Sequence, residues 1–181
     1  MRIITGTARG RKLEAPAGLA TRPTSEKVKE AVFSALQFEI EGARVLDLFA
    51  GSGQMGLEAL SRGASRCVIV DSSKAAQAAI RANIEAAGFG PEAKLVAGDA
   101  GAYLRSTADR FDIAFCDPPY RQENLSALLA GIGAVMAPAG ILALETDAAE
   151  DVPSQAAHLQ KHREYRYGKT KVTVFRTAAD E

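Results

Sequence analysis

Cysteine and histidine are scarce in this sequence, with two of each among 181 residues, and tryptophan is absent. Cys67 and Cys116 lie far apart in apolar stretches, without the Cys-x-x-Cys or Cys/His spacing of metal sites. A disulfide framework and a structural zinc site are therefore not expected, and no metal is predicted. We predict two buried, reduced thiols, as is typical of a cytoplasmic protein.

Long apolar runs are also few. The first six residues carry a charge and lack the continuous apolar core of a signal peptide, so no export is expected. Residues 125–144 contain no charged side chain over the length of a membrane span. Gly131, Gly133 and the turn at 138–140 divide this stretch into a helix, a turn and a strand, so we expect it in a buried core rather than in a membrane.

Disordered and fibrous classes are excluded by composition, because 47% of the residues are hydrophobic, 24% are charged and only seven are proline. The chain length fits one domain and leaves little room for a second complete core. We predict a basic extension over residues 1–40 and an α/β domain over 41–181.

The formal net charge is zero, because the sequence has 22 basic and 22 acidic residues. The distribution is uneven, however. Residues 1–30 hold seven Lys/Arg and three Glu, and residues 161–176 hold six and one, which leaves nine basic and 18 acidic residues elsewhere. Two basic ends on an acidic middle predict a polyanionic partner that contacts the ends.

Apolar β-type runs alternate with alanine-rich helical stretches along most of the chain. A small hairpin is expected at 2–5 and 11–15, and a helix at 28–36 with Thr24 or Ser25 as its cap. The alternation then predicts strands at 44–49, 67–70, 94–97, 112–116 and 140–145, and helices at 55–62, 74–87, 101–106 and 125–136. This order predicts a doubly wound, mainly parallel sheet, finished by an antiparallel strand pair at 156–167 and 170–176.

A glycine-rich loop follows the first of these strands. Gly51, Gly53 and Gly56 match the Gly-x-Gly-x-x-Gly pattern of dinucleotide sites, and Asp71 lies 20 residues after Gly51. A nicotinamide oxidoreductase is therefore one possibility. Asp47 would repel a pyrophosphate there, whereas S-adenosylmethionine has no phosphate and is cationic. The acids favour S-adenosylmethionine, with Asp71 on its ribose and Asp99 on its adenine amine.

The most informative motif is Asp117-Pro118-Pro119-Tyr120, directly after an apolar strand. Two prolines stiffen the turn and remove two N–H donors, so that carbonyl oxygens can face a bound group. If the Asp117 carboxylate and the Pro118 carbonyl accept the N–H groups of a nucleobase amine, its lone pair is drawn out of the ring toward a methyl group. Tyr120 offers a surface on which a flipped base can stack.

Together these motifs resemble the RsmD-type small-subunit ribosomal RNA guanine-N2 methyltransferases. Beyond the loop and the proline motif, four segments carry the resemblance: ITGTARGRKL at 4–13, RPTSEKVKEA at 22–31, VLDLFAGSG at 45–53 and GLEALSRGA at 56–64. The similarity covers most of the chain from residue 3 to about 145 and, weakly, the tail at Gly168, and the basic N-terminal segments make it specific among amino-group methyltransferases. Gln54 and Met55 depart from the smaller apolar residues expected at their positions.

The resemblance implies a Rossmann-like class I methyltransferase fold and site residues of three kinds. Cofactor binding falls to Asp47, Phe49, Gly51, Gly53, Asp71, Ser72, Asp99 and Ala100, and catalysis to Asp117, Pro118, Pro119 and Tyr120. The basic ends supply expected phosphate contacts from Arg9, Arg11, Lys12, Arg22, Lys169 and Lys171.

The resemblance thus implies methyl transfer from S-adenosylmethionine to N2 of a guanine in bacterial 16S rRNA, within a small ribosomal subunit or an assembly intermediate, by a cytoplasmic monomer. Adenine N6 or a protein glutamine amide are alternative acceptors. A nicotinamide oxidoreductase and a non-catalytic RNA-binding module are alternatives of other classes. The N-terminal hairpin could also serve only to cover the cofactor.

Overall fold

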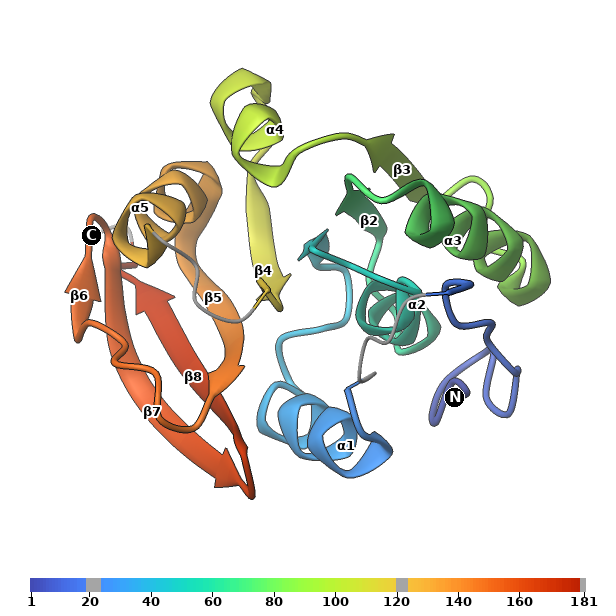
Figure 1. The fold of residues 1–181 in the computed structure, drawn as a ribbon, viewed down its shortest axis with the longest axis horizontal. Coiled ribbons are helices and arrows are strands. Elements are labelled where there is room, and N and C mark those ends of the chain that lie inside the picture. The colour runs from blue at the N-terminus through green and yellow to red at the C-terminus, as the bar shows by residue number, and fades with distance from the viewer. Residues whose placement is uncertain (19–23, 120–123, 180–181) are drawn as a thin grey trace.

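The computed structural model describes residues 1–18, 24–119 and 124–179 (Figure 1). Strands and helices alternate in the order α1 (Glu26–Ala35), β1 (Arg44–Leu48), α2 (Gln54–Ser61), β2 (Arg66–Asp71), α3 (Lys74–Ala87), β3 (Ala93–Ala97), α4 (Ala100–Ser106), β4 (Phe111–Cys116), α5 (Leu125–Val135), β5 (Met136–Asp147), β6 (Gln155–Ala156), β7 (Leu159–Tyr167) and β8 (Thr170–Thr177). Every helix and strand predicted from residue 28 onward is present within a few residues of its predicted bounds, except that the strand predicted at 156–167 is divided in two.

A single sheet runs through the molecule in the order β3-β2-β1-β4-β5-β8-β7-β6. The strands from β3 to β5 are parallel, and β8, β7 and β6 extend the sheet antiparallel to β5 and to one another. The predicted doubly wound sheet with an antiparallel end is therefore confirmed. Parallel strands have their carboxyl ends at one edge, which is where such sheets bind ligands.

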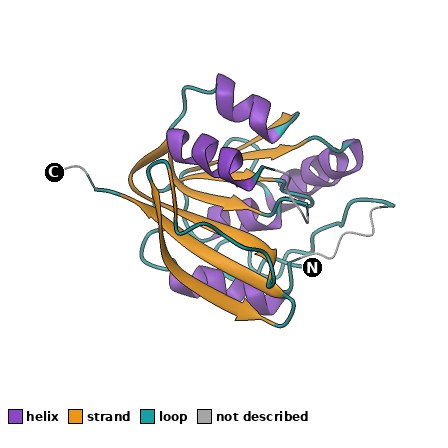
Figure 2. Cartoon of the chain, turned by 60° about the vertical axis from the view of Figure 1, so that its left-hand side comes forward, coloured by secondary structure: helices purple, strands orange, loops and turns teal. Residues whose placement is uncertain are grey.

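Helices cover both faces of this sheet (Figure 2). One core joins the sheet to α1, α2 and α3, through side chains such as Phe33, Leu57 and Ile80. The other joins it to α4 and α5, through Leu104 and Leu129 among others. Successive residues of the central strands enter opposite cores, so these strands are apolar on both faces, as buried parallel strands must be.

The predicted N-terminal hairpin is reduced to one antiparallel bridge, between Arg2 and Lys12. Around it the Ile3 amide donates to the Arg11 carbonyl and the Leu13 amide to the Met1 carbonyl. Ile3, Ala8 and Leu13 are buried in the same core as α1 and α2. The division into an extension and a domain stays a prediction.

We expected residues 138–140 to form a turn between a helix and a strand, but they do not separate the two elements. Instead β5 runs through them, with Ala139 at φ 56° and a shift in the β4–β5 register between Phe111 and Ile113. The predicted strand at 156–167 is likewise divided, because Ala157 has φ 50° and separates β6 from β7. Ala139 is thus an irregularity within β5, whereas Ala157 lies in the two-residue turn that joins the antiparallel strands β6 and β7.

Both cysteines are free and buried, as predicted, and burial raises the pKa of each thiol well above its ordinary value. The apolar stretch at 125–144 divides between α5 and β5. Over the residues that the structure covers, no helix has the length and apolar composition to cross a membrane. In the same residues no group of His, Cys, Asp and Glu is arranged to hold a metal ion.

Candidate functional site

Four acidic residues lie where neighbouring strands end at the carboxyl edge of the sheet. Asp47 is near the end of β1, Asp71 ends β2, Asp117 follows β4, and Glu145 is near the end of β5. Their strands are neighbours in the order β2-β1-β4-β5. The topology thus gathers carboxylates that are up to 98 positions apart in the sequence.

The glycine loop between β1 and α2 needs unusual backbone conformations. Gly51 has φ 60° and Gly53 has φ 76°, which favour glycine because a Cβ is strained there. Phe49 also has a positive φ, 54°, although it is a bulky residue. Such a conformation is costly for phenylalanine, and it lies where the chain turns into the site.

The amide groups of this loop are already occupied within the protein. Gly51 donates to Asp71 Oδ2 at 2.9 Å, Gly53 to the Ala50 carbonyl at 2.8 Å, and Gly56 to Asp47 Oδ2 at 2.9 Å. A dinucleotide pyrophosphate needs free amides at the beginning of this helix. Two of the three are held by carboxylates, which disfavours a phosphate at this loop.

Asp47 is 3% exposed. Burial raises its pKa to about 7, against the opposing effect of the Gly56 hydrogen bond. The structure therefore places Asp47 beneath the loop, where it fixes the first turn of α2.

A cavity of about 260 Å³ opens beside the loop. Its lining comes from the N-terminal segment, the loop, the end of β2 with the start of α3, and the proline motif: Met1, Ala15, Pro16, Thr24, Phe49, Ala50, Gly51, Ser52, Gln54, Asp71, Ser73, Ala76, Asp117 and Pro119. The volume is close to the lower end of small-molecule sites. The cavity joins the glycine loop to Asp117.

Gln54, which departs from the family pattern, lines this cavity and is 5% exposed. Its Nε2 donates to the Thr24 carbonyl at 3.3 Å, while its Oε1 is buried without a hydrogen-bond partner in the described chain. A buried acceptor of this kind is costly unless a bound group donates to it. This atom is therefore suited to a ligand with an N–H or O–H group.

Asp117 lines this cavity and a second, smaller one of about 40 Å³. Asp117 is partly exposed to solvent. The surrounding protein and the nearby carboxylates of Glu145 and Asp47 nevertheless raise its pKa to about 8. Pro118 beside it is buried.

Glu145 is the residue that sequence reasoning missed. It lines the smaller cavity with Asp117, and Thr24 Oγ1 donates to its Oε2 at 3.0 Å. Cys116 and Leu144 are register partners in the parallel pair β4–β5, so Asp117 and Glu145 follow side by side. No local motif marks Glu145, and only this register could have revealed it.

Five of the predicted cofactor residues are not in the lining of the larger cavity: Asp47, Gly53, Ser72, Asp99 and Ala100. Asp99 is exposed and caps α4, accepting from the Ala102 amide at 2.8 Å, while Ala100 is buried in the core behind it. Ser72 is exposed beyond β2. Their roles stay predictions, and Asp99 lies at the end of the sheet's outer strand.

The predicted RNA-binding residues differ in exposure. Arg9, Arg11, Lys12 and Lys169 are exposed. Lys171 is 3% exposed, and its Nζ donates to the Glu150 carbonyl at 2.6 Å and lies 3.7 Å from Glu164. The prediction for Lys171 is wrong, because this ammonium is already bonded inside the protein. Arg22 and Tyr120 lie outside the described residues.

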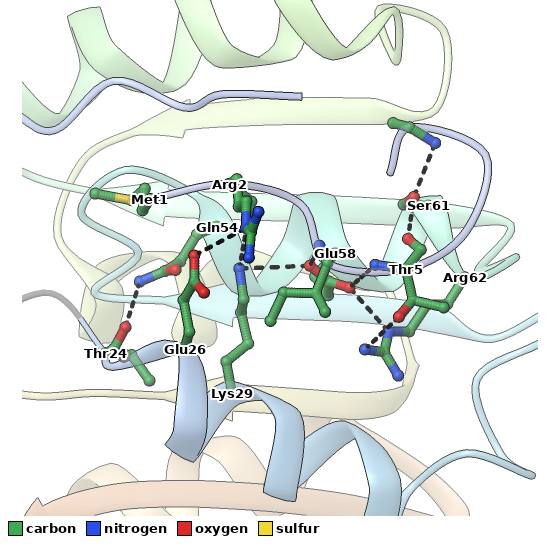
Figure 3. A network of polar contacts seen from close by, with 12 residues as sticks. Met1, Arg2, Thr5, Thr24, Glu26, Lys29, Gln54, Glu58, Ser61 and Arg62 are labelled. Carbon is green, nitrogen blue, oxygen red and sulfur yellow. Dashed lines mark hydrogen bonds and ion pairs between the residues drawn. The ribbon is translucent and has the colours of Figure 1, made fainter. Parts of the chain in front are cut away.

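A buried polar network fixes the N-terminal segment to α2 (Figure 3). Glu58 is fully buried and accepts from the amides of Ile4 at 2.8 Å and Thr5 at 3.0 Å. It also pairs with Lys29 at 3.4 Å and with Arg62 at 3.0 Å. The basic segment that follows is thereby fixed to the helix that begins at the glycine loop.

Ser61 completes this attachment. Its Oγ accepts from the Ala8 amide at 3.0 Å and donates to the Thr5 carbonyl at 2.6 Å. Gly6 packs so closely on Ser61 that a Cβ would overlap the Ser61 carbonyl oxygen. Only glycine fits there, since Gly6 also has φ 90°.

Known proteins resemble this chain over almost its whole length. The family model described as conserved hypothetical protein 95 matches residues 1–176. The protein YlbH of Bacillus subtilis is 38% identical, covering 97% of this chain and 98% of the relative. Ribosomal RNA small subunit methyltransferase D of Escherichia coli strain K12 is 33% identical, covering 99% of this chain and 91% of the relative.

The fold agrees with a solved structure as well. The Escherichia coli protein yhhF superposes with a TM-score of 0.86 at 32% identity, over 99% of both chains. Sequence motifs, family model and fold thus point the same way. The chain belongs to the family described as conserved hypothetical protein 95, the RsmD-type methyltransferases that its motifs resemble.

Proposed function

We propose that this protein transfers the methyl group of S-adenosylmethionine to the exocyclic N2 of a guanine in small-subunit ribosomal RNA. The observation that carries this proposal is the position of Asp117-Pro118-Pro119 at one cavity with the glycine loop. The name of the Escherichia coli relative, ribosomal RNA small subunit methyltransferase D, supplies the substrate class.

The cavity suits a cofactor without phosphate. The Gly51 and Gly56 amides are held by carboxylates, and the Gln54 Oε1 acceptor needs a donor, such as the amino group of S-adenosylmethionine. Gly51, Phe49 and Asp71 line the same space and would hold the nucleoside part. When bound, this cofactor supplies a methyl group on a cationic sulfur. The acidic lining favours that charge.

The proline motif prepares the amine of the base. The Asp117 carboxylate and the Pro118 carbonyl accept its N–H groups, which draws the nitrogen lone pair out of the ring. In the transfer the nitrogen would bond the methyl carbon as the bond from that carbon to the cofactor's sulfur breaks, and S-adenosylhomocysteine would leave. The nitrogen would also release one proton, which Asp117 can accept, and Tyr120 would stack on the flipped base. Positioning and polarisation are the means of catalysis in this scheme.

RNA docking falls to the exposed basic residues of both ends, Arg9, Arg11, Lys12 and Lys169, together with Arg22. They would offset the negative field of the carboxylates at the site. We assign the substrate to a small ribosomal subunit or its assembly intermediate, and the enzyme to the cytoplasm as a monomer.

The test is transfer of radiolabelled methyl groups to undermethylated small ribosomal subunits and to the naked RNA, with the product nucleoside identified by mass spectrometry. We expect N2-methylguanosine. Asp117→Ala is the matched variant, and its single-turnover rate is expected to fall roughly 10² to 10³-fold while cofactor binding persists.

Other outcomes would replace the proposal. N6-methyladenosine, or label in protein, would redirect the activity to the alternative acceptors that share the proline motif. RNA binding without any methyl transfer would leave a binding module. Calorimetry that finds NADH binding and no S-adenosylmethionine binding would identify an oxidoreductase instead.

A further inference from the structure

Two tyrosines of β7, Tyr165 and Tyr167, lie on the face of the sheet that continues outward from the candidate site. Val172 of β8 lines the smaller cavity together with Asp117, and Tyr165 is the register partner of Val172 on the next strand. Directly opposite residues of an antiparallel pair point to the same face, with Cβ atoms about 5 Å apart. Tyr165 is therefore the next side chain outward from the wall of that cavity.

Tyr167 follows on the same face, because it is two residues after Tyr165 on the strand. Its register partner is Thr170, which in turn pairs with Asp147 at the end of β5. Tyr167 is thus in register with the carboxyl end of β5, at the edge of the sheet that carries Asp117. The two tyrosines extend the site from β5 across β8 to β7 (Figure 1).

Both tyrosine side chains are partly buried. They pack against the core that α1 shares with the sheet, and part of each side chain stays exposed to solvent. Packing on a core fixes the orientation of a ring, so little conformational entropy remains to be lost when a base stacks on it. Aromatic rings on a sheet are a common surface for unpaired bases.

Basic side chains flank the tyrosine pair. Arg163 is exposed and is the register partner of Val174, which belongs to the same core as the tyrosines, so Arg163 lies on their face. Lys169 is exposed in the turn that follows Tyr167. The order along β7 and its turn is therefore cation, ring, ring, cation.

The acidic residue within this stretch lies on the other face. Glu164 alternates with Arg163 and Tyr165 along the strand and is the register partner of Thr173. Three cations neutralise it there, since Lys161, Arg166 and Lys171 all lie within 4 Å of its carboxylate. Glu164 therefore leaves the positive charge on the face of the tyrosines unopposed from within β7.

We propose that Tyr165 and Tyr167 form a stacking surface for unpaired nucleotides that adjoin the target guanine, with Arg163 and Lys169 on their phosphates. This inference rests on the proposed function, because it extends the RNA-binding surface from the same site. A flipped base leaves its neighbours without their stacking partner, and aromatic rings can replace it for any base. Alternating rings and cations match a single-stranded polyanion, which presents bases and phosphates in turn.

The test separates stacking from charge. One probe is an oligouridylate of about ten nucleotides, and the other is the same ribose-phosphate chain without bases. Both carry the same negative charge, but only the first can stack on a ring. Fluorescence anisotropy of the labelled probes at low salt measures both affinities. We expect the wild-type protein to bind the oligouridylate at least about tenfold more tightly than the base-free chain.

Tyr165→Leu and Tyr167→Leu keep an apolar side chain on the core but remove the flat ring. Each variant should weaken oligouridylate binding at least about fivefold and leave binding of the base-free chain unchanged. Phenylalanine at either position keeps the ring and should bind both probes as the wild-type protein does. Arg163→Ala should instead weaken the binding of both probes, and the slope of log K against log salt should become shallower by about 0.7.

Tyr103→Leu is the matched control, because Tyr103 of α4 is also partly buried but packs on the other core. Its affinity for both probes should equal that of the wild-type protein. Wild-type protein that does not distinguish the two probes would overturn the stacking surface. So would leucine variants of Tyr165 and Tyr167 that bind as the wild type does, or that lose affinity for both probes alike. Thermal melting and calorimetric binding of S-adenosylmethionine verify that each variant is folded.

Methyl transfer to undermethylated small-subunit ribosomal RNA then separates this inference from the proposed function. We expect both leucine variants to raise KM for the RNA while the affinity for S-adenosylmethionine stays unchanged. An unchanged KM in both variants would overturn the assignment of the tyrosines to the substrate RNA. A wild-type protein that transfers no methyl group would overturn the proposed function, whereas the probe measurements test the stacking surface without any turnover.

Discussion

The surroundings of Asp117 disfavour its ionised form. Its pKa is raised to about 8 by its protein surroundings, by Glu145 and by Asp47. The carboxylate is the form that can accept both a hydrogen bond and a proton, but near neutral pH most of the free enzyme holds Asp117 protonated. A cationic cofactor in the same cavity favours the ionised form.

The rate should therefore depend on pH in a defined direction. Below the pKa of Asp117 the ionised fraction rises with pH, so kcat/KM for methyl transfer should increase from pH 6, reach half its maximum near pH 8 and level off about one pH unit higher. Steady-state kinetics between pH 6 and 9.5 would measure this. Asp117→Asn, which cannot titrate, should lose the rise, and a variant profile that matches the wild type would assign the titration to another group.

At the same scale, residue type alone misled in two cases. Lys171 reads as a surface charge in the sequence, but every residue of β8 from 171 to 175 is buried, and a carbonyl and Glu164 satisfy its ammonium. Glu145 reads as an ordinary acidic strand end. Its neighbour Asp117 is 28 positions away and becomes a neighbour only through the parallel register.

Among the elements, α2 connects the N-terminal segment to the glycine loop. Glu58 on this helix receives two amides from the N-terminal segment and two cations, Lys29 and Arg62. Burial lowers the pKa of Lys29, and Glu58 opposes that effect. Glu58 is the acidic partner of the buried Lys29 ammonium, whereas Glu58 itself has a second cationic partner, Arg62. Loss of Glu58 should therefore destabilise the protein more than loss of Lys29.

This asymmetry makes a stability prediction. Glu58→Gln leaves the buried Lys29 ammonium without its counter-ion and should cost about 3 to 5 kcal/mol of unfolding free energy. Lys29→Met leaves Glu58 with Arg62 and both amides, and should cost clearly less. Urea denaturation measures both, with hydrogen exchange at the Ile4 and Thr5 amides as a local readout. An equal or larger loss in Lys29→Met would contradict this account of the network.

Element type and order were predictable because the periodicity and the glycine loop are local signals. The sequence Pro138-Ala139-Gly140 predicts a turn, but it does not predict that β5 continues through these residues. A proline and a glycine commonly end a strand, whereas here β5 continues on both sides, since its pairing with β4 resumes after the shift in register. Long-range pairing outweighed the local signal.

At the scale of the whole molecule, the formal net charge is zero, but the basic and acidic residues lie in different regions. The carboxylates gather at the carboxyl edge of the parallel strands, while Arg9, Arg11 and Lys12 are exposed on the N-terminal segment and Lys169 in the β7–β8 turn. In Figure 1 that segment and the β7–β8 turn lie on either side of α1. A polyanion could thus contact both ends across the site.

Replacing Arg9 and Arg11 with alanine should weaken RNA binding and leave S-adenosylmethionine affinity unchanged. The slope of log K against log salt should become shallower by roughly 0.7 to 0.9 for each phosphate that the variant no longer neutralises. Filter binding over a salt series measures the slope. Arg66→Ala with Arg110→Ala is the control, because both arginines are exposed at the amino ends of parallel strands, the opposite edge from Asp117. An unchanged slope in the Arg9/Arg11 variant would remove these residues from the RNA-binding surface.

The attachment of Ile4, Thr5 and Ala8 to α2 also constrains how this family can vary in length. The helix begins at the glycine loop and ends at Ser61, eight residues or about 12 Å later. One inserted residue would turn Glu58 and Ser61 by about 100° around the axis and advance them by about 1.5 Å, away from the segment they hold. We therefore expect insertions and deletions to be tolerated poorly between Gly53 and Ser61, and better around Gly90 between α3 and β3, where an added side chain would meet nothing within 4 Å.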